Sequence, residues 1–191
     1  MSHIALLKKV YHHQLFTDQQ MERVCLLHQR VRVKKGDFFI QINKFSNHYF
    51  ILEEGMARAQ VIDFQGNDIT TQFFIPGNII IEPYAMFHRA VAIENVIALS
   101  DCIAWKMDFN NFQNIFHNIP AMAEWGRLWM SENLTQLKLR SIEMITQDAT
   151  TRYMRLLETK PEIIQQAPLK HIATYLGITD TSLSRIRAKI S

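Results

Sequence analysis

The part of this sequence that most constrains its fold is residues 168–191, which read PLKHIATYLGITDTSLSRIRAKIS. Its first half has apolar residues at i, i+3, i+4 and i+7, the pattern of a helix with one buried face. Pro168 suits the first turn of this helix, and Gly177 can end it, because glycine readily adopts the left-handed conformation that closes many helices. Thr179 can then cap a second helix. The apolar residues of the two helices are Leu169, Ile172, Ala173 and Leu176, then Leu183, Ile186 and Ile190.

Two short helices joined by a three-residue turn that contains glycine are typical of a helix-turn-helix, whose second helix enters the DNA major groove. The charge of the segment supports this interpretation. Residues 168–191 contain four basic side chains and one acidic one, Asp180, and this excess equals the formal net charge of +3 of the whole chain. Phosphate binding through counterion release requires such a cluster. We therefore expect double-stranded DNA as a partner. The basic residues are Lys170, Arg185, Arg187 and Lys189.

Composition excludes several other classes of protein. The 191 residues are 48% hydrophobic and 20% charged, which is ordinary for a soluble globular protein of one or two domains. No run approaches the roughly 18 apolar residues that span a bilayer, and the N-terminus lacks a signal-peptide core, so we expect a cytoplasmic protein with no membrane partner. Cys25 and Cys102 alone cannot form a zinc ribbon or a cysteine-ligated iron–sulfur cluster.

Three histidines near the N-terminus, His3, His12 and His13, are the only clustered metal-ligand types, but no carboxylate or cysteine follows at ligand spacing. We predict no metal site and no cofactor; nothing in the sequence favours haem, which stays open as an alternative. The sequence also lacks a nucleophile with a neighbouring base, paired catalytic carboxylates and a phosphate-binding loop. We therefore expect no enzymatic activity.

Residues 29–106 have the texture of a β domain. Short alternating or apolar runs are separated by glycine turns at roughly 8 to 12 residues, which is typical of an all-β sandwich or barrel. Residues 65–68, Gln-Gly-Asn-Asp, resemble a hairpin turn. The predicted strands are residues 30–34, 38–42, 49–52, 57–63, 69–75, 79–81, 91–97 and 103–106.

Helices are predicted on both sides of this β domain. They cover residues 4–11 and 18–27, with Thr17 as a cap, then 109–116, about 120–145, and 149–159, with Asp148 as a cap. The long helix has two apolar stripes, so it must bury two surfaces, and the β domain and the same helix of a second copy suit them. A homodimer follows as a prediction; the alternative is a core helix buried on one side. The stripes are Met122, Trp125 and Trp129, then Met130, Leu134, Leu137 and Met144.

The order of these parts resembles the Crp/Fnr family of bacterial transcription regulators over nearly the whole chain. The most specific matches are residues 31–37 (VRVKKGD), 49–55 (YFILEEG), 76–78 (PGN), and 176–179 (LGIT) with 183–186 (LSRI). The ending at Ser191, without a further strand pair, is similar to short forms from Bacteroidetes-type bacteria. The resemblance implies a sensor β-roll, a dimerising long helix, a palindromic operator and contact with RNA polymerase.

The predicted fold class is therefore α+β: an N-terminal double-stranded β-helix or jelly-roll of the cyclic-nucleotide-binding type, a long dimerisation helix, and an all-α, winged-helix-like helix-turn-helix. The expected domains are residues 1–118, 119–146 and 147–191. The alternative to a regulator is a non-catalytic ligand-binding or adaptor protein whose helical C-terminus mediates assembly. Salt-dependent DNA binding distinguishes the two.

The ligand pocket departs from the family pattern. Members that bind cyclic AMP have a Gly-Glu pair and, ten residues beyond the glutamate, an arginine with a serine or threonine, which bind the ribose and the cyclic phosphate. Here the matching pairs are Ile81-Glu82 and Ala92-Ile93, and Arg89 lies three residues early. The phosphate anchor is missing, which argues against cyclic AMP. We expect instead an apolar pocket. Its predicted residues are Ile79, Ile81, Glu82, Met86, Phe87, Arg89 and Ala92.

The second helix of the helix-turn-helix allows residue-level predictions. Arg185 can bind the O6 and N7 of a guanine with two hydrogen bonds, worth roughly 1–3 kcal/mol of discrimination. Thr181 stands where the family usually has a glutamate, so a different base readout is expected there. The predicted base-reading residues are Thr181, Ser182, Ser184 and Arg185. The predicted phosphate contacts are Lys170, His171, Thr179, Arg187 and Lys189.

Overall fold

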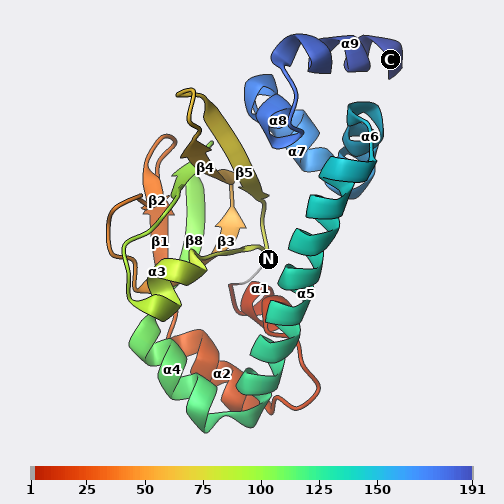
Figure 1. Ribbon diagram of the computed structural model, residues 1–191. Coiled ribbons are helices and arrows are strands. Elements are labelled where there is room, and N and C mark those ends of the chain that lie inside the picture. The colour runs from red at the N-terminus through yellow and green to blue at the C-terminus, as the bar shows by residue number, and fades with distance from the viewer. Residues whose placement is uncertain (1–2, 191) are drawn as a thin grey trace.

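The computed structural model describes residues 3–190, and in them the β domain is a sandwich of two four-stranded sheets (Figure 1). One sheet has the strand order β1-β8-β3-β6 and the other β2-β7-β4-β5, with all neighbouring strands antiparallel. The strands are β1 (Gln29–Val33), β2 (Phe38–Ile40), β3 (His48–Glu54), β4 (Ala57–Ile62), β5 (Asp68–Phe74), β6 (Ile79–Ile80), β7 (Asn95–Ala98) and β8 (Cys102–Asp108).

The predicted strands are confirmed with small shifts at their ends. The one larger difference is at residues 91–97, where the strand begins only at Asn95 and Val91 forms an isolated bridge to Phe45. The predicted hairpin turn joins β4 to β5, and Gly66 provides the positive φ of +85° that this turn requires. The β-sandwich predicted from short strands and glycine turns is therefore correct.

Strand β3 contributes side chains to two apolar cores, one between the two sheets and one on the outer face of its own sheet. Side chains alternate between the faces of a strand. Phe50 and Leu52 point into the sandwich, whereas Tyr49 and Ile51 pack on its outer face beneath the helices. Such burial on both faces accounts for the unbroken apolar run of this strand in the sequence. Strand β6 divides in the same way, with Ile80 inside the sandwich and Ile79 outside it.

Four helices cover this outer face: α1 (His3–Val10), α2 (Asp18–Leu26), α4 (Phe109–Asn118) and the first half of α5 (Pro120–Thr146). Thr17 begins α2 with a complete capping box to Gln20, as its position in the sequence predicts. Close packing of α4 on α5 depends on Gly126, because a Cβ there would lie 2.7 Å from a ring carbon of Phe116. The side chain of His3 lies outside the described residues.

The C-terminal part is all helical, with α6 (Ala149–Thr159), α7 (Pro161–Gln166), α8 (Leu169–Tyr175) and α9 (Asp180–Ile190). Asp148 caps α6, since its carboxylate accepts the Thr151 N–H at 2.7 Å. The short helix α7 lies beyond the predicted helices; it begins at Pro161, and proline suits the first turn of a helix. No helix in residues 3–190 is long and apolar enough to cross a membrane.

Candidate nucleic-acid interface and effector pocket

The turn between α8 and α9 is fixed by local hydrogen bonds. Gly177 has a φ of +68°, its N–H donates to the Thr174 carbonyl at 3.1 Å, and the Ile178 N–H donates to the Ala173 carbonyl at 3.0 Å. These bonds form the Schellman motif that closes a helix. The Thr179 hydroxyl then accepts the Ser182 N–H at 3.2 Å and begins α9. The helix-turn-helix therefore has the helix end and the cap that its sequence predicts.

Helix α9 has one buried face and one exposed face. Leu183 is fully buried, whereas Thr181, Ser184 and Arg185 are exposed together with Lys189. Ser182 is half-buried, and its hydroxyl bonds to that of Thr179 at 3.0 Å. Three of the four predicted base-reading residues thus lie on the exposed side of the helix, and the fourth contributes to its cap.

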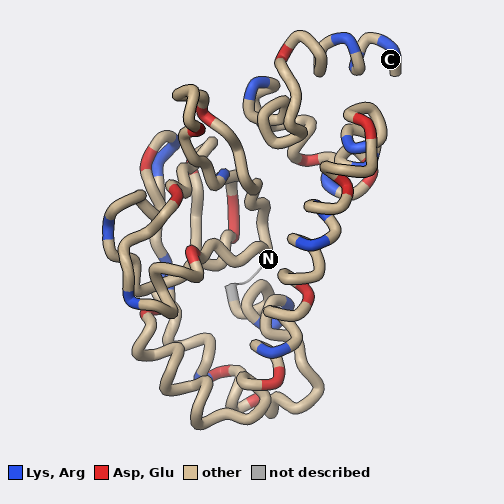
Figure 2. The backbone as a smooth tube through the Cα atoms, viewed as in Figure 1, with Lys and Arg blue, Asp and Glu red and all other residues tan. Residues whose placement is uncertain are grey.

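The predicted phosphate contacts divide in a similar way. Lys170 and Thr179 are exposed with Lys189, and Arg187 is half-buried. Figure 2 shows the basic segments of α8 and α9, with a single acidic segment at the start of α9. The basic residues of these two helices therefore lie in the C-terminal helical part, at the opposite end of α5 from α2 and α4 (Figures 1 and 2).

His171 differs from the prediction. It is only 7% exposed, and burial together with the nearby Arg58 guanidinium lowers its pKa to about 4. The ring is therefore neutral at pH 7 and faces the β domain, where Arg58 donates to the Asp68 carboxylate at 2.7 Å. A neutral, buried ring is not placed to contact phosphate in this arrangement. His171 thus lies in α8, as predicted, but on the buried face of that helix.

His171 is buried because α8 packs against the edge strand β5. The Thr70 N–H donates to the Thr174 hydroxyl at 3.1 Å, and the Phe73 and Tyr175 rings meet edge to face with centroids 5.3 Å apart. Met56 and Phe73 of the β domain share one apolar cluster with side chains of α6, α8 and α9, including Leu156, Ile172 and Leu183. The helix-turn-helix is thus docked on the sandwich, a contact that the sequence did not predict.

Arg140 of α5 links the three parts that meet here. Its guanidinium donates to the carbonyls of Thr71 in β5 and of Tyr175 in α8, the latter at 3.1 Å, and lies 4.1 Å from the centroid of the Tyr175 ring. One turn further along α5, the Met144 methyl contacts the turn of the motif, since a Cβ on Gly177 would lie 2.6 Å from it. The second half of α5 therefore contacts both the sensor-like sandwich and the helix-turn-helix.

The two predicted stripes of α5 have different surroundings. Met122 and Trp125 are buried in the outer core of the sandwich. In the other stripe, Met130 is 48% exposed, Leu134 69% and Leu137 62%. Met144, predicted in that second stripe, instead has its methyl group against Gly177. The described chain thus leaves an uncovered apolar surface along the middle of its longest helix.

The residues at the positions where cyclic-AMP-binding members hold the ribose and the phosphate have local structural contacts in this chain. The Glu82 carboxylate is 4% exposed and caps α3 (Pro83–His88), accepting the N–H groups of Tyr84 at 3.1 Å and Ala85 at 2.7 Å. Ala92 is packed inside the sandwich. Arg89, at a positive φ of 52°, extends toward the Phe109 ring, whose centroid is 5.5 Å away. None of these three residues lines the cavity described next, contrary to their inclusion in the predicted pocket.

A cavity of about 290 Å³ opens between β3, β6, α3, α4 and α5. The predicted pocket residues Ile79, Ile81, Met86 and Phe87 do line it. Sequence reasoning missed the other walls, which come from helices distant in the sequence. Those lining residues are Tyr49, Phe112, Gln113, Phe116, His117, Trp125, Gly126, Trp129 and Met130. Four of the seven predicted pocket residues are thus brought together around one space.

Comparisons with known proteins agree with this architecture. Residues 30–118 match the family model of the cyclic nucleotide-binding domain. No curated protein matches the chain in sequence.

Solved structures resemble nearly the whole chain. FixK2 from Bradyrhizobium japonicum has a TM-score of 0.74 at 14% identity, over 85% of this chain and 84% of its own. The c-di-GMP responsive global regulator CLP of Xanthomonas campestris has a TM-score of 0.71 at 13% identity, over 91% of each chain. A putative transcriptional regulator of the Crp/Fnr family from Eubacterium rectale has 0.69 at 15% identity, over 92% of this chain and 83% of its own. At these identities the likeness establishes the fold.

Proposed function

We propose that this chain, which has a cyclic nucleotide-binding domain at residues 30–118 and the overall architecture of a Crp/Fnr-type regulator, is a sequence-specific DNA-binding transcription regulator. It acts as a homodimer on a palindromic operator. The observation that carries the proposal is helix α9. It is basic, it is capped by Thr179 directly after the helix-turn-helix turn, and one of its faces is exposed.

Helix α9 supplies groups suited to both kinds of DNA contact. Arg185 has the planar fork that binds a guanine edge, and Thr181 and Ser184 offer hydroxyls beside it on the same exposed face. Lys170 and Lys189 supply charge for the phosphates, which fixes the register of the helix without reading sequence. His171 is left out of this set, because it is buried against the β domain.

A homodimer is supported by the uncovered stripe on α5. Leucine and methionine at intervals of three and four residues form the apolar seam of paired helices. Leu134 and Leu137 are more than 60% exposed and have this spacing with Met130. Two copies of α5 side by side would cover the stripe and give the complex a two-fold axis. The two α9 helices would then read half-sites about 34 Å apart.

The sensor domain is proposed to respond to something other than cyclic AMP. The glutamate that would hold the ribose caps α3 instead, and the position of the phosphate-binding arginine is Ala92, packed in the core. No described basic residue thus occupies the position of the phosphate anchor. Contact with RNA polymerase, which the family resemblance implies, remains part of the same proposal.

The decisive experiment is selection of bound sequences from random duplex DNA by the purified protein, with and without cyclic AMP. We expect an enriched inverted repeat that is the same in both conditions. Enrichment only with cyclic AMP would contradict the proposal for the sensor domain. No enrichment, together with binding that does not weaken as salt rises, would favour the adaptor alternative.

Two substitutions on α9 test the proposed roles on the selected operator. Arg185→Ala should relax the preference at one base pair, with a loss of roughly 1–3 kcal/mol of discrimination. Lys189→Ala should weaken binding to all sequences about equally and reduce the salt slope by about one unit. Affinities measured on the operator and on random DNA distinguish the two effects. Equal losses on both DNAs for both variants would contradict this division.

A further inference from the structure

The cavity beside α5 is separate from the interior of the sandwich. Strand β6 divides the two spaces, because Ile80 packs inside the sandwich whereas Ile79 lines the cavity on the other face. Of the residues at the nucleotide-anchor positions, Ala92 lies in the inner core and Glu82 is not in the cavity wall. The cavity is therefore a different site from the cyclic-nucleotide pocket that the family resemblance implies.

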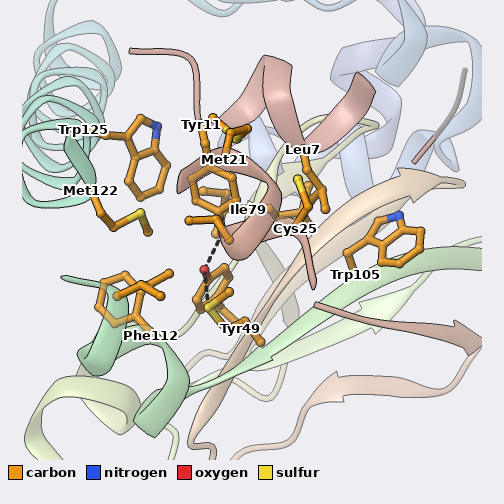
Figure 3. Close-up of a cluster of buried hydrophobic side chains, with 14 of the residues drawn as sticks. Leu7, Tyr11, Met21, Cys25, Tyr49, Ile79, Trp105, Phe112, Met122 and Trp125 are labelled. Carbon is orange, nitrogen blue, oxygen red and sulfur yellow. Dashed lines mark hydrogen bonds between the residues drawn. The ribbon is translucent and has the colours of Figure 1, made fainter. Parts of the chain in front are cut away.

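Aromatic rings dominate the walls of this cavity. Phe112 and Phe116 of α4 lie 5.4 Å apart by centroid, and Trp125 and Trp129 of α5 are stacked at 6.1 Å. Tyr49 also lines the cavity, and its hydroxyl bonds to that of Tyr11 in the adjoining core (Figure 3). Flat apolar molecules pack well among rings in these offset and edge arrangements.

The polar side chains of the wall are few. Gln113 and His117 lie one turn apart on α4, and their side chains bond to each other at 3.0 Å. Among the described residues that line the cavity there is no lysine, arginine, aspartate or glutamate. An ionised carboxylate or phosphate in this space would lose hydration and find no lysine or arginine in the wall to pair with, which is costly. The site therefore discriminates against anions.

We propose that this cavity binds an uncharged, flat, mostly apolar molecule with a single oxygen that hydrogen-bonds to Gln113 or His117. The volume of about 290 Å³ lies at the small end of the range for ligand sites and suits about a dozen non-hydrogen atoms. As a binding site this inference is independent of DNA. As an effector site it rests on the proposed function, since Trp125 and Trp129 belong to the same helix as Arg140, which contacts the helix-turn-helix.

The test is isothermal titration calorimetry on the whole chain at neutral pH, without DNA, so that its outcome is distinguishable from that of the operator selection. The probes are naphthalenemethanol, methylnaphthalene and naphthoate, which share one ring system and differ in the polar group. We expect naphthalenemethanol to bind most tightly and naphthoate to bind at least tenfold more weakly. Naphthoate binding as tightly as the alcohol would overturn the assignment of an uncharged ligand.

Two variants place the binding in this cavity. Ile81→Phe fills the cavity from its wall and should weaken naphthalenemethanol at least tenfold, whereas Ile62→Phe, the same change at a side chain that is 60% exposed and not in the wall, should have no effect. Gln113→Leu should weaken the alcohol several-fold and leave methylnaphthalene unchanged. Absence of binding by the wild-type chain, or equal binding by Ile81→Phe and Ile62→Phe at matched thermal stability, would overturn the proposal.

Discussion

The two halves of helix α5 are held in the molecule by different forces. The first half buries Met122 and Trp125 in the apolar outer core, where the exposed fractions are 0% and 7%. The second half is attached through Arg140, which donates hydrogen bonds to carbonyls of β5 and α8, through the methyl group of Met144, and through the ion pair of Glu143 with Arg155 of α6. The first half thus rests on close apolar packing, whereas the second half rests largely on a few charge-assisted hydrogen bonds, which contribute about 1.5–3 kcal/mol.

The same difference separates the helices α6 to α9 from the core around the first half of α5. The helices α6 to α9 contact the β domain through the cluster around Met56 and Phe73 and through the polar bonds near Arg140 and Thr174. The first half of α5 does not pack in that cluster. It belongs to the same core as α1, α2 and α4. The contacts that hold α6 to α9 on the β domain are therefore distinct from the core that holds the first half of α5.

The largest effect is expected in the first half of the helix. Trp125→Ala removes a ring that is packed against Tyr11 at 4.7 Å and donates to the Val10 carbonyl at 2.9 Å. The loss should be about 3–5 kcal/mol of unfolding free energy, the usual range for a buried large side chain. Denaturant unfolding measures it. A loss below about 1 kcal/mol would show that the two halves are not differently anchored.

A smaller and more local effect is expected in the second half. Arg140→Ala removes two charge-assisted hydrogen bonds and should cost about 1.5–3 kcal/mol. Hydrogen exchange should become faster in α8 and β5 while the first half of α5 keeps its protection. The matched control is Arg127→Ala on the same helix, whose solvent-exposed ion pair with Glu124 should leave the unfolding free energy nearly unchanged. Equally faster exchange along all of α5 would contradict the comparison.

Contacts between residues close in the sequence could be predicted, whereas contacts between distant residues could not. The turn at Gly177 and Thr179 was predicted, because its partners lie within a few residues. The bond between Thr70 and Thr174 joins residues 104 positions apart, and no sequence pattern indicates such a pair. For the same reason His171 was assigned to DNA rather than to the β domain.

The walls of the cavity were likewise predicted only in part. Ile79 and Ile81 were predicted as lining because they share a short apolar strand run near the family's ligand motif. Phe112 and Trp125 were not predicted, since only the packing of α4 and α5 on the sandwich brings them to the same space. Sequence reasoning thus identified one wall of the cavity and missed the helices that complete it.

The smallest effect concerns pH and the docked helix α8. His171 has a pKa of about 4 in the folded chain, below the ordinary value of 6.5, because it is buried and faces Arg58; Asp68, Lys170 and Asp180 are the other charges near it. As the pH falls below about 6.5, the unfolded chain binds this proton first, so stability is greatest above that pH and is lost as the pH falls toward 4. Between pH 7 and pH 5 the contribution of His171 to this loss should be about 1–2 kcal/mol.

His171→Gln isolates this contribution, because it keeps a polar side chain of similar length without a titrating ring. His28 and His48 also have pKa values of about 4, owing mainly to burial, so the wild-type chain loses stability in acid through all three rings. Denaturant unfolding at pH 7 and pH 5 should therefore show a smaller acid loss in His171→Gln than in the wild type. Hydrogen exchange should place the difference in α8 and β5. The same acid loss in both proteins would mean that His171 is not held neutral by the β domain, and that docking of α8 is weaker than its contacts indicate.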